Sequence, residues 1–190
     1  YLKLLSRFEL TVEQANLMYD APGRDKKFAP STDAEILGNP YRLYELTRPS
    51  PDGVKLLMVD RGVFPDDVVR LKHPLDAPSQ LESSIDLRRV RAFTIAALEA
   101  AALAGNTLLP YQHVVEAVQA YPVNPKCPVT SNMLAARAAE MAPELIPVSM
   151  NDGHALQLSR YQQIGALVRQ QALARVKGQR HKLERDWIKL

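Results

Sequence analysis

Apolar residues recur at steps of three and four in the second half of the chain, which is the spacing of one helix face. They predict a long helix over 86–104, a second helix after Leu109 and a third that Thr130 caps. The apolar faces are Val90, Phe93, Ala97, Ala101 and Ala104 in the first helix, Val114, Val115, Val118 and Tyr121 in the second, and Leu134, Ala138 and Met141 in the third.

The segments between these helices complete a characteristic order. We expect 106–109 to be extended and the proline-rich segment 121–128 to be irregular. Asn151-Asp152-Gly153 favours a tight hairpin between 144–150 and 154–159. Helix, extended segment, two helices and hairpin together predict a winged-helix-like domain over 86–160. Such domains usually bind nucleic acid or hold other domains in register.

The first half predicts a small helical domain over 1–72. Capping boxes at Thr11–Gln14 and Thr32–Glu35 each predict a short helix. Further short helices should begin at Asn39-Pro40 and near Phe64 to Asp67, whereas Ala21 to Pro30 is expected to form a loop. Val54 to Val59 fits either a strand or a buried helical turn. Residues 73–85 are expected to be a linker.

Basic residues concentrate in the last part of the chain, where 161–190 predicts a basic helix. Residues 160–190 contain eight Lys or Arg against Glu184 and Asp186, a net charge of +6 in a chain of +3, so residues 1–159 carry −3. A basic stripe can follow phosphates, but a charged run can equally be a solvated helix face. Trp187 and Ile188 would need a surface to cover them.

The composition is that of an ordinary soluble globular protein, with 46% hydrophobic and 24% charged residues among 190. No apolar run is long enough for a membrane span, and we find no signal peptide. One cysteine, Cys127, excludes an internal disulfide and a cysteine-built zinc site, which favours a cytoplasmic location. The chain lacks a starting methionine and stops inside a helical pattern, so we expect a fragment of a longer protein.

No residue cluster predicts catalysis, and we assign no catalytic, cofactor-binding or metal-binding residue. The phosphate-loop string Gly-x-x-x-x-Gly-Lys-Ser/Thr and the string Gly-x-Gly-x-x-Gly are both absent from the sequence. The four histidines lack ligand partners at helical spacing. Cys127 follows Lys126, which could activate it, but an inert loop thiol is the favoured interpretation. Asp66-Asp67 could act as an acid–base pair, but a helix start is favoured.

Two groups of basic residues are candidates for contact with DNA. Arg88, Arg89 and Arg91 lie in the first turn of their helix, where the dipole disfavours cations, so Asp86, another carboxylate or a DNA phosphate should compensate them. The third helix, the usual groove reader, offers only Arg137 beside Glu140, and residues 107–159 carry a net charge of −2. The second group is therefore the basic end of the chain, namely Arg169, Arg175, Lys177, Arg180 and Lys182.

Several strings resemble RecD-like DNA helicases of the exodeoxyribonuclease V alpha-subunit type. Residues 36–43, Ile-Leu-Gly-Asn-Pro-Tyr-Arg-Leu, resemble the family's "NPYRL" element. Residues 88–92, 97–101 and 105–110 resemble its "R-x-RA … AL-EAA … GHT-LP" run, with Asn106 where the family often has histidine. The resemblance covers about 8–170. It implies helix-hairpin-helix elements and then a winged-helix-like segment, both preceding an ATPase motor that moves 5′ to 3′ on single-stranded DNA.

The resemblance implies that this chain is an accessory region that positions DNA, single-stranded or at a junction, beside its own motor domain in recombination or repair. ATP and magnesium would bind to that motor and not to these residues. One departure is that 59–65 replaces a glycine-rich hairpin that can approach the DNA backbone. A DNA-binding transcriptional regulator and a protein-interaction module remain the alternatives.

Overall fold

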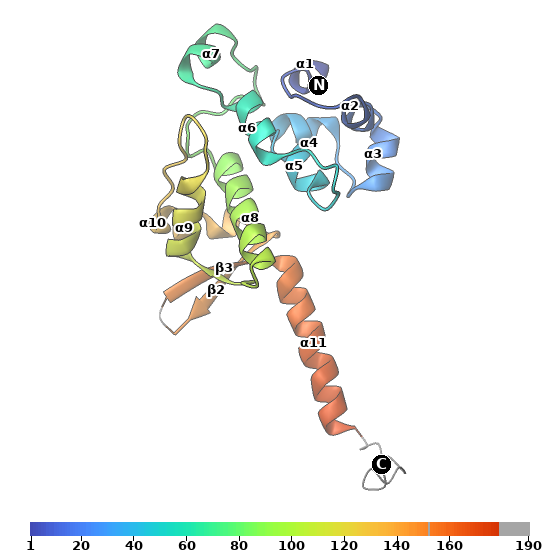
Figure 1. Cartoon of the computed structure of the whole chain (residues 1–190), viewed down its shortest axis with the longest axis vertical. Coiled ribbons are helices and arrows are strands. Elements are labelled where there is room, and N and C mark those ends of the chain that lie inside the picture. The colour runs from blue at the N-terminus through green and yellow to red at the C-terminus, as the bar shows by residue number, and fades with distance from the viewer. Residues whose placement is uncertain (152, 179–190) are drawn as a thin grey trace, which may run out of the picture.

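A computed structural model describes residues 1–151 and 153–178, which form a mainly helical molecule with one small antiparallel sheet (Figure 1). Short helices make up the N-terminal part. A long helix, the sheet and two further helices make up the centre, and a last helix projects away from both. The expectation of a mainly α-helical fold is confirmed.

The N-terminal part begins with four short helices, two of which start at capping boxes. Both predicted capping boxes are present: Thr11 accepts a hydrogen bond from the Gln14 amide at 3.2 Å, and Thr32 accepts one from the Glu35 amide at 3.2 Å. Each box satisfies amides that a helix start leaves free. The helices are α1 (Leu2–Leu5), α2 (Val12–Tyr19), α3 (Ala21–Lys27) and α4 (Asp33–Gly38).

Helix α3 corrects the expectation of a loop over Ala21 to Pro30. A proline in its first turn is preorganised for a helix start. The Arg24 side chain is fully buried and donates hydrogen bonds to the carbonyl oxygens of Met18 at 2.8 Å and Ser31 at 2.7 Å. The charged composition that suggested a loop therefore contains a buried arginine that fixes the helix in place.

Three more short helices follow, α5 (Arg42–Thr47), α6 (Leu56–Val63) and α7 (Asp67–Lys72). The undecided segment Val54 to Val59 lies mostly in α6. Segment 73–85 contains no helix or strand, as expected of a linker, but Leu75, Ser79 and Leu81 are buried in it. This connection therefore packs against the body over part of its length.

The central part has the element order α8 (Leu87–Leu103), β1 (Leu109–Pro110), α9 (Tyr111–Ala120), α10 (Ser131–Arg137), β2 (Leu145–Met150) and β3 (Gly153–Leu158). A 3₁₀ turn, η1 (Ala138–Met141), extends α10. The sheet order is β1-β3-β2, and β2 pairs with β3 from Leu145 opposite Leu158 to Met150 opposite Gly153. Gly153 has a φ of 138°, a conformation suited to glycine at a hairpin. The extended segment expected over 106–109 is reduced to the two residues of β1.

One hydrophobic core extends through both parts of the molecule. Tyr41, Val59 and Phe64 from the N-terminal helices belong to the same buried cluster as Phe93 of α8 and Leu156 of β3. Helix α8 thus joins the N-terminal helices to the sheet, and it lies between them in Figure 1. The continuous core crosses the predicted boundary at 73–85.

Helix α11 (Ser159–Lys177) continues directly from β3 and leaves the body (Figure 1). Every residue from 162 to 178 is exposed. Among the described residues, none of the helices is both long enough and apolar enough to cross a bilayer. The last part of the predicted basic helix, including Arg180, Lys182, Trp187 and Ile188, lies outside the described residues.

Candidate functional site

The candidate arginines of α8 lie beside carboxylates, and Arg89 is the most buried of them. Its guanidinium pairs with both carboxylate oxygens of Asp60 on α6, at 2.8 and 2.9 Å, and it also donates to the carbonyl oxygen of Pro125 at 2.7 Å. Arg89 has no exposed surface and Asp60 has 2%. A phosphate therefore has no access to this guanidinium.

Tyr41 joins the same buried pair. Its hydroxyl donates to Asp60 at 2.6 Å. Burial, and then the negative charge of Asp60, raise the pKa of Tyr41 well above its ordinary value. The hydroxyl therefore stays protonated and keeps donating, so Asp60 is fully hydrogen-bonded without solvent.

Arg91 and Arg88 are also neutralised within the protein. Arg91 pairs with Glu45 of α5 at 3.0 Å and donates to the carbonyl oxygen of Met141 at 2.7 Å. Arg88 pairs with Asp86 at 2.8 Å. Burial alone would raise the pKa of Asp86, but hydrogen bonds from Arg88 outweigh it and the pKa is lowered. Carboxylates thus neutralise the positive charges in the first turn of α8. All three arginines hold elements of the fold together.

Glu99 is a second point where distant elements meet. It accepts from Arg48 at 2.7 Å and from the Tyr44 hydroxyl at 3.3 Å, and it pairs with Arg160 of α11 at 3.3 Å. Arg48 also pairs with Glu144 before β2. This cluster ties the N-terminal helices and α8 to the first turn of α11, so it fixes the point from which α11 projects.

Helix α10, the expected reader of a DNA groove, has little free positive charge. Thr130 caps it as predicted, accepting a hydrogen bond from the Met133 amide at 3.3 Å. Its one cation, Arg137, pairs with Glu140 at 3.2 Å. The two strands of the hairpin, 145–150 and 153–158, contain no lysine or arginine. This surface therefore offers phosphates very little in the described part of the chain.

The described cations of α11 do not form one stripe. An α-helix turns by about 100° per residue. Six positions separate Arg169 from Arg175 and two separate Arg175 from Lys177, so successive cations are rotated by about 120° and about 160° around the axis. Over Ser159–Lys177 the cations therefore do not form the stripe that could follow phosphates, which leaves the alternative of a solvated helix face. Arg180 and Lys182 fall among the residues that the structure does not describe.

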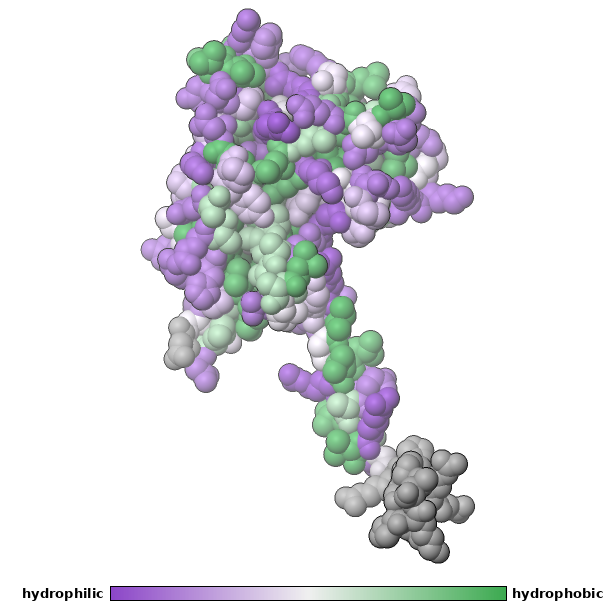
Figure 2. Space-filling view, viewed as in Figure 1, coloured by the Kyte–Doolittle hydropathy of each residue, from purple (hydrophilic) through white to green (hydrophobic). Residues whose placement is uncertain are grey.

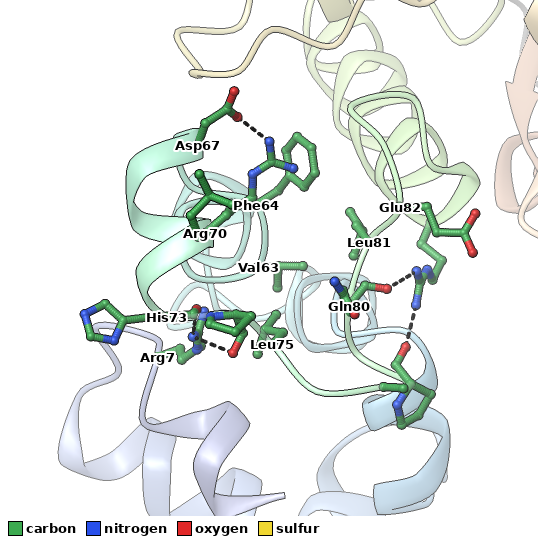
Figure 3. Close-up of a pocket in the computed structure, with 15 residues that line it drawn as sticks. Arg7, Val63, Phe64, Asp67, Arg70, His73, Leu75, Gln80, Leu81 and Glu82 are labelled. Carbon is green, nitrogen blue, oxygen red and sulfur yellow. Dashed lines mark hydrogen bonds and ion pairs between the residues drawn. The ribbon is translucent and has the colours of Figure 1, made fainter.

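A hollow of about 760 Å³ lies between α7 and segment 77–82. In Figure 3, Phe64, Asp67 and Arg70 lie on one side of it, and Gln80, Leu81 and Glu82 on the other. Three arginines line it, but each is already engaged. Arg7 donates to backbone carbonyl oxygens of residues 62, 73 and 74, and Arg70 stacks 4.1 Å from the Phe64 ring and pairs with Asp67. Arg88 donates to carbonyl oxygens of residues 38, 78 and 80.

The side chains considered for catalysis cap a helix, form an ion pair or are buried. Asp66 accepts from the Val69 amide at 3.0 Å, which confirms a helix start, and Asp67 pairs with Arg70. Cys127 is buried, and burial raises the pKa of its thiol to about 11, which disfavours the reactive thiolate. Within the described ranges, no group of three or more His, Cys, Asp or Glu side chains could hold a metal ion.

Sequence reasoning missed the carboxylates Glu45 and Asp60. Both are nearly buried, and each neutralises an arginine of α8. The available signal was Asp60, a carboxylate in a mostly apolar stretch that also contains Lys55 and Arg61, because a buried carboxylate needs a partner. The partner could not be identified from local spacing, since Arg89 lies 29 residues away.

Comparisons with models of known families, with curated proteins and with solved structures found no match to this chain.

Proposed function

We propose that this chain is a non-catalytic, architectural region of a RecD-like, ATP-dependent DNA helicase that moves 5′ to 3′. In this proposal the helical body holds the motor domain, and through it the DNA, in a defined position. ATP and magnesium bind to the motor and not to the body. The basis is the resemblance in sequence together with the way in which the resembling strings come together in space.

The observation that carries the proposal is the convergence of these strings. Tyr41 comes from the "NPYRL" element and Arg89 from the "R-x-RA" element, and both bind to Asp60. Glu99 comes from the "EAA" element and binds to Arg48 and Arg160. A buried charge network is costly unless every member has a partner, so these residue types are required together. The "NPYRL" and "R-x-RA" elements are about 50 residues apart in the sequence. Both are explained by one structural role, which is to fix the N-terminal helices to α8.

The order of elements supports the finer description of the fold. The order α8-β1-α9-α10-β2-β3 with sheet order β1-β3-β2 is the order expected of a winged helix, and it supports the proposal of that fold for 86–160. The short consecutive helices α2–α3 and α4–α5 are the candidates for the helix-hairpin-helix elements. Segment 59–65 lies largely in α6, with Asp60 and Gly62 buried, and offers no exposed hairpin to DNA.

A transcriptional regulator is less well supported, because reading duplex DNA requires cations on α10 or on the hairpin. The one cation of α10 is paired with Glu140. A protein-interaction module has better support, since α11 exposes large aliphatic side chains. That observation is compatible with the architectural role, because a helix that holds a motor domain is also an interaction surface.

Two measurements test the proposal. The gene should continue into a sequence containing Gly-x-x-x-x-Gly-Lys-Ser/Thr, and the longer polypeptide should unwind a 5′-tailed duplex with ATP and magnesium. The absence of that string, or unwinding only with 3′ tails, would reject it. A salt titration of binding to single-stranded and duplex DNA, with residues 1–190 and 1–159, should show at most weak, non-specific binding by either polypeptide. Tight, sequence-preferring duplex binding by 1–159 would favour the regulator.

A further inference from the structure

Helix α11 has almost no contact with the rest of the described molecule beyond its first turn. Ile164 is 53% exposed, Val168 62% and Val176 82%. Figure 2 shows the helix standing clear of the body with apolar and hydrophilic surfaces mixed along it. Helices in proteins draw most of their stability from packing of an apolar face, so the exposed aliphatic residues indicate a missing contact surface.

The aliphatic residues of α11 are not confined to one side. Ile164, Leu167 and Val168 form one group, Leu173 lies opposite Ile164, and Val176 lies between them, about 80° from Val168. Ile164 and Leu173 are nine residues apart, which is a rotation of about 180°. A helix on a protein surface has one apolar stripe. Apolar groups on two sides indicate that protein covers α11 on at least two sides.

Gly165 gives an independent indication. Glycine lowers the stability of a helix interior relative to alanine, so a reason for it should be visible. Gly62 in α6 has such a reason, because a Cβ there would lie 2.6 Å from the Phe8 ring. At Gly165 a Cβ would meet nothing within 4 Å. With Tyr161, Ala166 and Leu173 it forms a shallow groove of about 630 Å³, which a side chain of a partner could fill.

The charges of α11 indicate the chemistry of that partner. The helix contains Arg160, Arg169, Arg175 and Lys177 and no carboxylate. Arg160 pairs with Glu99, whereas within the described residues the other three form no ion pair. These three are distributed around the axis among aliphatic residues. A DNA strand along one side would leave most of them unpaired and the aliphatic side chains in water. An acidic, partly apolar protein surface would satisfy both kinds of residue.

We propose that α11 is embedded between acidic, partly apolar surfaces of the ATPase domain, and that its arginines pair with carboxylates there and not with DNA phosphates. This inference rests on the proposed function, which supplies that domain. In this proposal the basic end of the chain binds the ATPase domain. DNA binding by α11 becomes the competing outcome.

Hydrogen–deuterium exchange measured by mass spectrometry tests this directly. Residues 1–190 are compared with the longer polypeptide that contains the ATPase domain, each with and without single-stranded and duplex oligonucleotides. We expect the amides of 162–177 to exchange at least tenfold more slowly in the longer polypeptide without DNA. Ile164→Asp and Leu173→Asp, on opposite sides, should each remove that protection. Gln163→Asp, which introduces the same charge at a polar position of the helix, should leave most of it.

Gly165→Ala is a second variant, and we expect it to change the exchange rate of α11 in opposite directions in the two polypeptides. In residues 1–190 it should slow exchange of α11, because alanine favours the helix. In the longer polypeptide it should speed exchange, because the methyl group occupies the groove. If Gly165 affected only the stability of the helix itself, Gly165→Ala would slow exchange in both polypeptides.

The outcomes separate the two proposals. If the longer polypeptide unwinds 5′-tailed DNA but α11 exchanges as fast as in residues 1–190, only this inference fails. This inference also fails if the amides of α11 are protected only when DNA is added, both in residues 1–190 and in the longer polypeptide, because α11 then contacts DNA. If the longer polypeptide shows no ATP-dependent unwinding, the proposed function fails, and this inference fails with it.

Discussion

The arginines at the start of α8 and those along α11 look alike in the sequence, yet the fold uses them in opposite ways. Arg89 is buried against Asp60, and Arg91 is mostly buried against Glu45. Arg169 and Arg175 lie on an exposed helix that contains no carboxylate. The difference shows that positive charge in a chain of this kind is not by itself a sign of DNA binding. What decides its role is whether a carboxylate from a distant element reaches it.

The largest effect should come from breaking the buried pair. Asp60→Ala leaves the Arg89 guanidinium without its counter-ion in a site closed to water, which should destabilise the protein by about 3–5 kcal/mol. Urea denaturation followed by circular dichroism measures the loss. The matched control is Arg61→Ala on the same helix. Its pair with Glu9 is exposed, at 67% and 75%, and should contribute less than about 1 kcal/mol. Equal effects of the two variants would show that Asp60 is solvated.

Cys127, close to the same buried pair, should make stability depend on alkaline pH. Its folded pKa of about 11 lies above the ordinary thiol value, so its contribution is complete below about pH 9 and is lost as the pH rises towards 11. Two pKa units correspond to about 2–3 kcal/mol. Denaturation of wild type and Cys127→Ala at pH 7.5 and 10.5 isolates this contribution, because other groups titrate in both proteins. An unchanged difference between them would mean that the thiol is exposed.

Gly62→Ala tests the close approach between α6 and the segment after α1. The added Cβ would lie 2.6 Å from a carbon of the Phe8 ring and 2.8 Å from the carbonyl oxygen of Arg7, so the ring and the backbone must both shift. Such overpacking should cost about 1–3 kcal/mol, measured by thermal and urea denaturation. Gly38→Ala is the control, since its Cβ meets nothing within 4 Å. A stabilised Gly62→Ala would disprove the contact.

Local signals predicted most of the helices, and they did so for physical reasons. Capping boxes, prolines at helix starts and a three–four apolar spacing act within one or two turns, so Thr11, Thr32 and Thr130 marked true helix starts. Helix α3 was missed because Arg24 holds it through contacts with Met18 and Ser31, which charged composition does not reveal.

The candidate site was less predictable, because its charges are paired over long distances. The sequence identified Arg88, Arg89 and Arg91 as cations that need compensation, but only Asp86 was close enough to name as a partner. Glu45 lies 46 residues from Arg91. For α11, counting cations could not show their distribution around the helix, nor that most of its aliphatic residues are uncovered.

Replacing the cations of α11 should have the smallest effect on the unfolding free energy. This test sharpens the comparison with α8. Arg169→Gln combined with Arg175→Gln should change the unfolding free energy of residues 1–190 by no more than about 0.5 kcal/mol, because both side chains are exposed. Arg91→Gln is the matched variant on α8 and should cost about 2 kcal/mol, since buried Glu45 would lose its closer cation and keep only the 3.4 Å contact with Arg42. Urea denaturation measures both. If α11 is attached to an ATPase domain as proposed, the α11 double variant should weaken that attachment and lower the midpoint of unfolding of the longer polypeptide. If the double variant destabilised residues 1–190 by more than about 1 kcal/mol, α11 would have to fold back onto the body in solution, and the contrast between the two groups of arginines would be lost.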